Sequence, residues 1–206
     1  MGTREPTGIF AAASLDIVDI PLGSIYGRIY RQTFSNPLGY GKNPSRFSDP
    51  RRRIADHRFG VLYLGSSLKV CFLEAVLRDD RDGVVGDHLM DEAELDTRSY
   101  AEIEIQAPLR LIDLTDDGPV RMGIPSDVIR SSKQELARRW SEAIHGHSAQ
   151  VDGILYPSRL NGETNLAIYD RAVSKLVARP VYSLRRARGL AAVLNDLKVG
   201  LVGSRG

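Results

Sequence analysis

Short apolar or alternating segments recur along the chain, and they predict strands rather than long helices. Residues 100–106, YAEIEIQ, alternate between apolar and polar positions, as a half-buried strand does. Residues 60–64, GVLYL, form a short apolar run that is typical of a buried strand. The other segments expected to be strands are 24–34, 109–115, 153–156, 165–169 and 177–184. Because Pro180 interrupts the last segment, we expect it at a sheet edge.

Two segments carry helical signals. A Ser-Ser pair (residues 66–67) supplies N-caps for a helix that ends at about Arg78, before the charged turn RDDRDG. Ser132 followed by Glu135 is a capping-box pattern, which predicts a second helix through about Ile144.

The arrangement of these segments defines a fold class. Residues 35–58 are rich in Asn, Pro, Gly, Ser and Arg and predict a long loop. No regular alternation of strand and helix appears, so the sequence predicts an α+β fold with a mixed or antiparallel β core and flanking helices. We expect a single domain over residues 1–206, with a core at about 24–185, an extended lead-in at 1–20 and a peripheral segment at 186–206.

Composition narrows the class of protein. Of the 206 residues, 42% are hydrophobic, which is enough for a core, and no apolar run approaches the length of a membrane span. The first ten residues lack the basic and apolar segments of a secretory signal. Cys71 is the single cysteine, so neither an internal disulfide nor a cysteine-based zinc site can form. We therefore expect a soluble, cytoplasmic protein with no membrane association.

The charge pattern gives little support for a nucleic-acid partner. The net charge is +2, and basic and acidic residues interleave along most of the chain, whereas nucleic-acid binding usually concentrates basic residues on one face. We therefore expect no direct nucleic-acid binding. The dense basic run Arg51-Arg52-Arg53 is interpreted first as a solvated loop, with a phosphate contact as the alternative.

Glu74 occupies a position that invites a functional explanation. At 3.6 residues per turn it shares one helical stripe with three apolar residues, Val70, Leu73 and Leu77. A buried carboxylate without a partner is costly, so this one must be paired, hydrogen-bonded or open to a cleft. It can pair with Arg78, four residues further on. The alternative is a carboxylate at the floor of a ligand site, where catalytic acids and bases are found.

Arginines and aromatic residues upstream of this helix suit a phosphorylated ligand with a flat ring. Guanidinium groups offer a planar set of donors that fits phosphate oxygens, and aromatic rings offer stacking faces. The residues are Arg28, Arg31 and Arg46, among Tyr26, Tyr30, Tyr40 and Phe47. Composition alone makes this a weak signal, since Arg-rich loops more often form ordinary surface. Neither Gly-x-Gly-x-x-Gly nor a P-loop is present, which argues against a Rossmann or kinase-like nucleotide site.

The segment DGILYPSRLNGETNLAIYD presents Ser158 at the end of an apolar strand. Its hydroxyl can bond the backbone of the following turn or can face a site. The spacing Gly-x-Ser-x-Gly of a serine hydrolase is absent. No metal-ligand spacing is apparent at the four histidines, which are His57, His88, His145 and His147. We expect no metal site, and we expect the last two histidines to cap a helix end or to be solvated.

The order of these pieces resembles the RES-domain family, which is named for its Arg, Glu and Ser residues. An Arg in a strand is followed by Arg-Phe in a loop, a Tyr strand, a Glu in a helix and a Ser at a strand end. The matching stretches are IYRQTFSNPL, SRFSDP, GVLYLGSSLKVCFLEAVLRD, DGILYPSR and NLAIYD, from about residue 24 to about residue 170. Each stretch alone is unspecific, but the combination is specific.

This resemblance implies a fold related to the diphtheria-toxin-like ADP-ribosyltransferases. It implies cleavage of NAD⁺ between nicotinamide and ribose, with water or phosphate as acceptor, so that NAD⁺ is the substrate and no cofactor is required. RES proteins are typically the toxin of a bacterial toxin–antitoxin pair. The implied partner is an antitoxin with an Xre-like helix-turn-helix that covers the active site, in dimers or larger complexes.

The resemblance also matches individual residues of this chain to the motif positions of the family. Arg31 best matches the family's first Arg, because it follows Ile-Tyr and precedes Asn-Pro-Leu, and Arg28 is the alternative. The other matches are Arg46, Tyr63, Glu74 and Ser158. Many members have Arg-Trp-Asn where this chain has Arg-Phe-Ser (residues 46–48), a variant that keeps an aromatic ring and leaves the role of the Asn side chain open.

In the implied reaction, positive charge develops on the ribose as nicotinamide leaves, as in glycoside cleavage. Glu74 would stabilise that charge, while Arg31 and Arg46 would bind the pyrophosphate. Tyr63 and Tyr30 would form a wall for nicotinamide and ribose. Ser158 would donate a hydrogen bond to the ribose or to the nicotinamide amide.

Three other functions remain open at this stage. A transferase that moves ADP-ribose onto a protein would use the same pocket. A non-catalytic interaction module is the second, although the retained polar residues argue against it. A nucleic-acid binder is the third, and its affinity would fall steeply with added salt.

Overall fold

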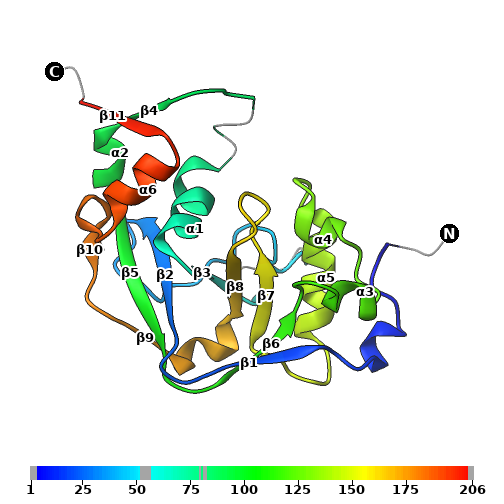
Figure 1. Cartoon of the computed structure of the whole chain (residues 1–206). Helices are drawn as coiled ribbons and strands as arrows, with labels where there is room; N and C mark the ends of the chain where they lie inside the picture. The colour runs from blue at the N-terminus through cyan, green and yellow to red at the C-terminus, as the bar shows by residue number, and fades with distance from the viewer. Residues whose placement is uncertain (1–3, 52–56, 79, 81–82, 204–206) are drawn as a thin grey trace.

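A computed structural model of the chain describes residues 4–51, 57–78, 80 and 83–203 (Figure 1). The earlier elements are η1 (Phe10–Ala12), β1 (Ile17–Ile20), β2 (Ile25–Arg31), β3 (Val61–Gly65), α1 (Leu68–Phe72), η3 (Leu73–Leu77), β4 (His88–Asp91), α2 (Glu92–Asp96) and β5 (Arg98–Ile105). The later elements are β6 (Leu109–Asp113), α3 (Gly118–Arg121), α4 (Asp127–Arg130), α5 (Glu135–His145), β7 (Gly153–Pro157), β8 (Thr164–Tyr169), η4 (Asp170–Lys175), β9 (Leu176–Ala178), β10 (Tyr182–Ser183), η5 (Leu184–Arg186), α6 (Leu190–Asp196) and β11 (Val199–Val202). The predicted α+β class is confirmed. Within the described residues, no helix is both long and apolar enough to cross a membrane.

Among the described residues, nine strands form one sheet in the order β1-β6-β7-β8-β3-β2-β5-β10, with β9 also paired to β5. β6 and β7 run parallel, and the other neighbours run antiparallel. β1 pairs with β6 and β2 pairs with β5, so these segments form one long ladder that bends where β1 passes into β2 (Figure 1). Gly23 has a φ of +83° at this bend and donates its N–H to Ile105 O at 2.8 Å, a conformation that favours glycine.

The sheet is split between β2 and β3. These neighbours share a single register pair, Gly27↔Gly65, whereas β3 pairs with β8 over five residues and β2 with β5 over seven. The part of β2 that follows Gly27 and the part of β3 that precedes Gly65 therefore separate. One half of the sheet leans away from the other, and polar side chains can lie between them.

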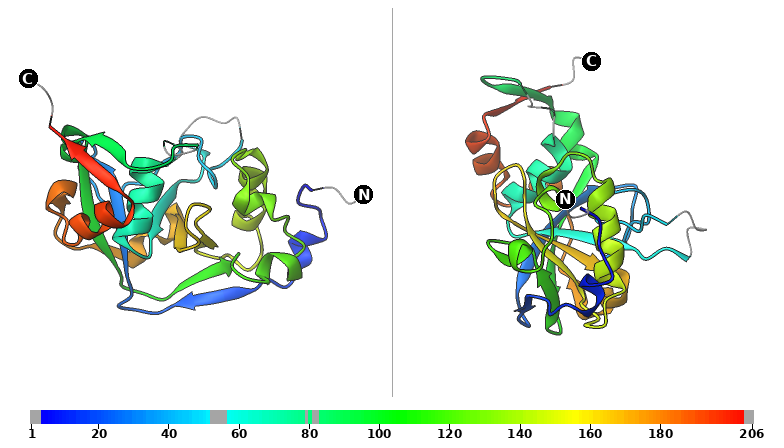
Figure 2. Two further views of the ribbon diagram at one scale, coloured as in Figure 1. Left: turned by 45° about the horizontal axis from the view of Figure 1, so that its top comes forward. Right: turned by 90° about the vertical axis from the view of Figure 1, so that its right-hand side faces the viewer.

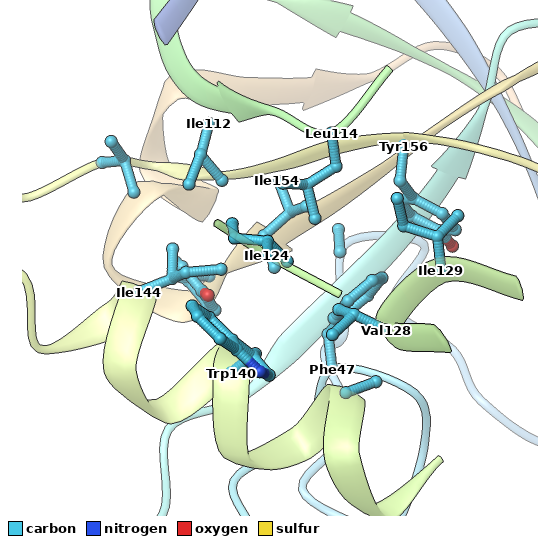
Figure 3. Packing of buried hydrophobic residues seen from close by; sticks show 14 of the residues in the cluster. Phe47, Ile112, Leu114, Ile124, Val128, Ile129, Trp140, Ile144, Ile154 and Tyr156 are labelled. Atoms are coloured by element: carbon cyan, nitrogen blue, oxygen red, sulfur yellow. The ribbon is translucent and has the colours of Figure 1, made fainter. Parts of the chain in front are cut away.

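Apolar clusters lie on both faces of the sheet. One face buries residues from nearly every strand, including Leu62, Ile103 and Leu111. The opposite face is covered by two separate groups of helices, which lie on either side of the β7–β8 hairpin (Figures 1 and 2). α4 and α5 pack over β6, β7 and β8 around Trp140 (Figure 3). α1, α2 and α6 pack beside β2 and β5 around Phe72.

The strands predicted between residues 24 and 169 correspond to β2, β3, β5, β6, β7 and β8. The predicted last strand is divided around Pro180 into β9 and β10, and β10 lies at the sheet edge as expected. The C-terminal segment predicted to be peripheral contains α6 and β11, and β11 pairs with β4 in a second, two-stranded sheet.

Both predicted helices form, with corrections at their ends. The first is α-helical only to Phe72 and then widens into a π-helical turn, η3. The second begins at Glu135 with Gln134 as the N-cap residue, so the predicted cap at Ser132 is wrong. The Oγ of the preceding Ser131 instead accepts the N–H of Lys133 in a local turn.

Candidate active site

A cleft of about 460 Å³ opens where β2 and β3 separate. Its walls come from β2, β3, the loop over residues 41–46, the end of α1 with η3, and the β7–β8 hairpin. The predicted site residues that line it are Arg28, Arg46, Tyr63 and Glu74. The split in the sheet thus brings together residues that are far apart in the sequence.

Close packing fixes α1 over this split. Ser67 caps the helix by accepting the N–H of Val70 at 3.1 Å. A Cβ added at Gly65 would lie 2.7 Å from Val70 Cγ1 and 2.8 Å from Cys71 Sγ, and one added at Gly27 would lie 3.0 Å from the same sulfur. The two glycines of the single β2–β3 register pair therefore let the helix approach. Burial raises the pKa of Cys71 to about 12, so the thiol keeps its proton at neutral pH.

The helix changes geometry at Glu74. The N–H of Arg78 bonds to Leu73 O at 2.7 Å, which is the i→i+5 bond of a π-helical turn. Such turns often occur at functional sites. Arg78 Nε donates to the backbone oxygen of Glu74 at 3.1 Å, and no ion pair with the Glu74 carboxylate exists within the described residues. The Glu74 carboxylate therefore does not form the i,i+4 ion pair with Arg78 that the sequence allowed.

Neutral donors hold the Glu74 carboxylate. Ser158 Oγ donates to Oε1 at 2.7 Å, and Asn165 Nδ2 lies 3.4 Å from the same oxygen. Ser158 is 3% exposed and also accepts the N–H of Leu160 at 3.2 Å, so it belongs to the turn and to the site at once. Among the described residues, none donates to Oε2. The carboxylate is thus fixed through one oxygen, and its other oxygen is available to a ligand.

Arg28 and Arg31 lie on the same strand but in different surroundings. The Arg28 guanidinium lines the cleft and donates to Pro37 O and, at 2.7 Å, to Gly39 O. Burial lowers the pKa of Arg28 to about 10, so it remains protonated at neutral pH. Arg31 is exposed at the end of β2 and does not line the cleft, so the expectation that it rather than Arg28 faces the ligand is not supported. Tyr30, expected in the wall, lies instead in the apolar cluster that contains Leu62, Ile103 and Leu111.

Arg46 forms the opposite wall. Its Nη1 donates to the backbone oxygen of Ser131, just past the end of α4, at 2.9 Å. It also lies 3.4 Å from the backbone oxygen of Val128, which is within α4. Burial lowers the pKa of Arg46, and the nearby Tyr156 and Glu74 oppose that shift. As with Arg28, its partners are backbone carbonyls and not a carboxylate.

Tyr63 holds the loop that carries Arg46. Its hydroxyl accepts the N–H of Phe47 at 2.9 Å and lies 2.9 Å from Ser45 Oγ. Burial raises the pKa of Tyr63. Phe47 is fully buried below the loop, and Ser48 Oγ bonds to the backbone N and O of Ser45. The Ser48 side chain is therefore turned into the loop and not toward the cleft.

The floor of the cleft contains residues that sequence analysis missed. The register pairs Gly65↔Asn165 and Tyr156↔Asn165 place three residues in one row across β3, β8 and β7. All three line the cleft, as do Gln134 and Arg159. The signal available in the sequence was polar: Asn165 starts an otherwise apolar run, NLAIY, and Tyr156 ends another, GILY.

The remaining expectations concern histidines and the basic run. His145 is half-buried and stacks on Phe59 with ring centroids 4.2 Å apart, and burial lowers its pKa to about 4. His147 is buried and accepts the N–H of Ala149 at 3.0 Å, which is a local capping role. Arg51 pairs with Asp49, while Arg52 and Arg53 lie outside the described residues. Within the described ranges, no three His, Cys, Asp or Glu residues gather as a metal site would require.

Comparison with known proteins identifies the class. The RES domain family model matches residues 23–189, and the chain therefore belongs to the RES-domain family. It is 41% identical over 127 residues to a probable toxin, y4kH, of Sinorhizobium fredii, which covers 61% of this chain and all of that protein.

A solved structure shares the fold. The crystal structure of the M. tuberculosis MbcT–MbcA toxin–antitoxin complex contains a chain that superposes with a TM-score of 0.62. The match covers 87% of this chain and 91% of that chain at 17% identity, so it is evidence for the fold alone.

Proposed function

We propose that this protein is a RES-type toxin that depletes NAD⁺ by cleaving the bond between nicotinamide and ribose, with water or phosphate as the acceptor. The observation that carries the proposal is a carboxylate, Glu74, held by neutral donors in a cleft where Arg28 and Arg46 donate to backbone carbonyls. Charges that the protein leaves without a counter-charge are available to a charged ligand.

The charges of the cleft are complementary to a dinucleotide. Among the described residues, the lining includes Arg28, Arg46, Arg78 and Arg159 but a single carboxylate, Glu74. Guanidinium groups bind pyrophosphate oxygens through charge-assisted hydrogen bonds. We assign the pyrophosphate to the wall formed by Arg28 and Arg46, and this assignment moves the role first expected of Arg31 to Arg28.

Glu74 supplies what the chemical step needs. The C1′–N bond breaks with its electron pair passing to the pyridinium nitrogen, which leaves as neutral nicotinamide. Positive charge develops on the ribose, and a carboxylate beside it lowers the barrier. An oxygen of water or phosphate then bonds to C1′, and a water nucleophile gives up a proton, for which Glu74 Oε2 is the available acceptor. No cofactor takes part in this scheme.

The biological role follows from the relatives. One is described as a probable toxin, and the structural neighbour is a toxin in complex with an antitoxin. We propose that this chain is likewise the toxin of such a pair, that it acts in the cytoplasm, and that its antitoxin is of the Xre-like type. Co-expression with a neighbouring antitoxin gene should restore growth that the toxin alone arrests.

Loss of NAD⁺ in the presence of the purified protein tests the activity, with and without inorganic phosphate and with products identified by mass spectrometry. Glu74→Gln keeps the shape and the Ser158 contact, and we expect it to lower the rate at least about 100-fold, as for loss of a positioned catalytic group. Glu94→Gln is the matched control, because that residue pairs with Arg98 outside the cleft and should leave the rate unchanged. Equal rates for wild type and Glu74→Gln would refute the assignment.

A further inference from the structure

Tyr156 is buried in β7, yet its hydroxyl has no partner in the part of the chain that the structure describes. The residue is 7% exposed and lines the cleft. Two other tyrosines differ: the partly buried Tyr63 bonds to Ser45 and Phe47, and the buried Tyr169 bonds to Ser141. A buried polar group normally has a hydrogen-bond partner, so an unpaired hydroxyl requires an explanation.

The oxygen of this hydroxyl is not fully enclosed by the described residues. Among the described residues, the fully enclosed side-chain atoms without a partner are Arg58 Nε, Arg98 Nε and His147 Nε2, and the Tyr156 hydroxyl is not one of them. Since it has no partner and is not enclosed, it reaches the space that the residue lines. Arg46 and Glu74 both lie close enough to act on its ionisation.

The ring of Tyr156 is held firmly, which gives its hydroxyl a defined position. Phe47 packs edge to face against it with ring centroids 4.9 Å apart (Figure 3). Asn165, which touches Glu74, is its register partner on β8. Burial raises the pKa of Tyr156 well above its ordinary value, so the hydroxyl keeps its proton and can donate.

We infer that Tyr156 is a further ligand-binding residue of the cleft, whose hydroxyl donates a hydrogen bond to an oxygen of the ADP-ribosyl group between Arg46 and Glu74. This inference rests on the proposed function. It assigns to β7 a donor in addition to the Arg, Glu and Ser residues, and it explains why position 156 carries a tyrosine and not a phenylalanine.

Tyr156→Phe removes the hydroxyl and keeps the ring. NAD⁺ binding would be measured by calorimetry in the Glu74→Gln protein, which does not consume the ligand, with and without Tyr156→Phe. We expect the dissociation constant to rise about five- to tenfold, as for loss of one neutral hydrogen bond. The unfolding temperature should be unchanged or higher, because no bond within the described protein is lost.

Tyr169→Phe is the matched control. Its hydroxyl is bonded to Ser141, so this change should lower the unfolding temperature without changing NAD⁺ affinity. Unchanged affinity in Tyr156→Phe overturns the inference and leaves the proposed function intact. A loss of affinity that comes with a comparable loss of stability assigns Tyr156 to the core and overturns it as well. Failure of the Glu74→Gln parent to bind NAD⁺, together with wild type that does not consume it, overturns the proposed function and this inference together.

Discussion

The half-buried charges of the cleft and the buried carboxylates Asp49 and Asp152, which lie outside it, have opposite kinds of partner. In the cleft, Glu74 is bonded to neutral Ser158 and Asn165, and Arg28 and Arg46 are bonded to backbone carbonyls. By contrast, the buried carboxylates Asp49 and Asp152 each have an opposite charge as partner. Asp152 pairs with Lys175 at 2.7 Å, and Asp49 pairs with Arg51.

This difference in partners distinguishes charged residues that stabilise the fold from charged residues that can bind a ligand. Removing a charge from water costs several kcal/mol, and a nearby opposite charge with good hydrogen bonds offsets that cost. Asp152 and Asp49 are compensated within the protein. The charges of the cleft keep part of their interaction capacity for another molecule. Substitution of Asp49 or Asp152 should therefore lower stability, and substitution of the charged cleft residues should lower ligand affinity.

Asp152→Ala should show the largest effect on stability. The carboxylate also accepts the N–H of Arg110 at 2.8 Å, so the change leaves two groups without their partner. We expect a loss of about 3 kcal/mol, at the low end for a broken buried pair because Lys175 remains partly exposed. Urea unfolding measures it, and NAD⁺ affinity should not change. A large loss of affinity at constant stability would remove the contrast between the two regions.

Arg46→Gln should show the reverse pattern. It removes a charge from the proposed pyrophosphate site, for which we expect about 30-fold weaker NAD⁺ binding, or about 2 kcal/mol for a charge-assisted hydrogen bond. Its two contacts at α4 contribute less, so unfolding should change by under about 1 kcal/mol. Calorimetry and urea unfolding on the same protein separate the two. If the loss in free energy of unfolding exceeded the loss in free energy of NAD⁺ binding, Arg46 would act mainly in stabilising the fold, as Asp49 and Asp152 do.

Arg28→Gln and Arg31→Gln form a matched pair on one strand. Arg28 lines the cleft and Arg31 does not, so we expect about tenfold weaker NAD⁺ binding for the first and under about twofold for the second. The opposite order would return the phosphate contact to Arg31, as the sequence alone suggested.

Acid should weaken the fold through His145. Burial, with Arg171 nearby, lowers its folded-state pKa to about 4 from 6.5, so the unfolded chain binds a proton between these values while the folded chain does not. Stability must therefore fall as the pH drops from 6.5 toward 4. His145→Gln removes this titration, and the difference in unfolding temperature between pH 7 and pH 5 should shrink relative to wild type. An unchanged difference would contradict the shift.

Strand periodicity predicted most of the sheet because each of those segments buries a continuous or alternating apolar face. The split between β2 and β3 was not predictable, since it depends on two glycines, Gly27 and Gly65, meeting in a single register pair under α1. The π-helical turn was also hidden, because the stripe of Val70, Leu73 and Leu77 fits an α-helix equally well.

The candidate site was predicted in part. The order of motifs led to Arg46, Tyr63, Glu74 and Ser158, which the structure places in or beside one cleft. The choice between Arg28 and Arg31 depends on where the sheet opens, which a motif does not encode. Tyr156 and Asn165 were missed because each looks like an ordinary strand residue until strand pairing brings both next to Glu74.

A crystal structure of Glu74→Gln with NAD⁺ tests the central claim most directly. The account predicts that the pyrophosphate lies within hydrogen-bonding distance of Arg28 and Arg46, with the nicotinamide riboside bond beside the side chain at position 74. NAD⁺ bound outside this cleft, or bound within it with the pyrophosphate away from both guanidinium groups, would contradict the account.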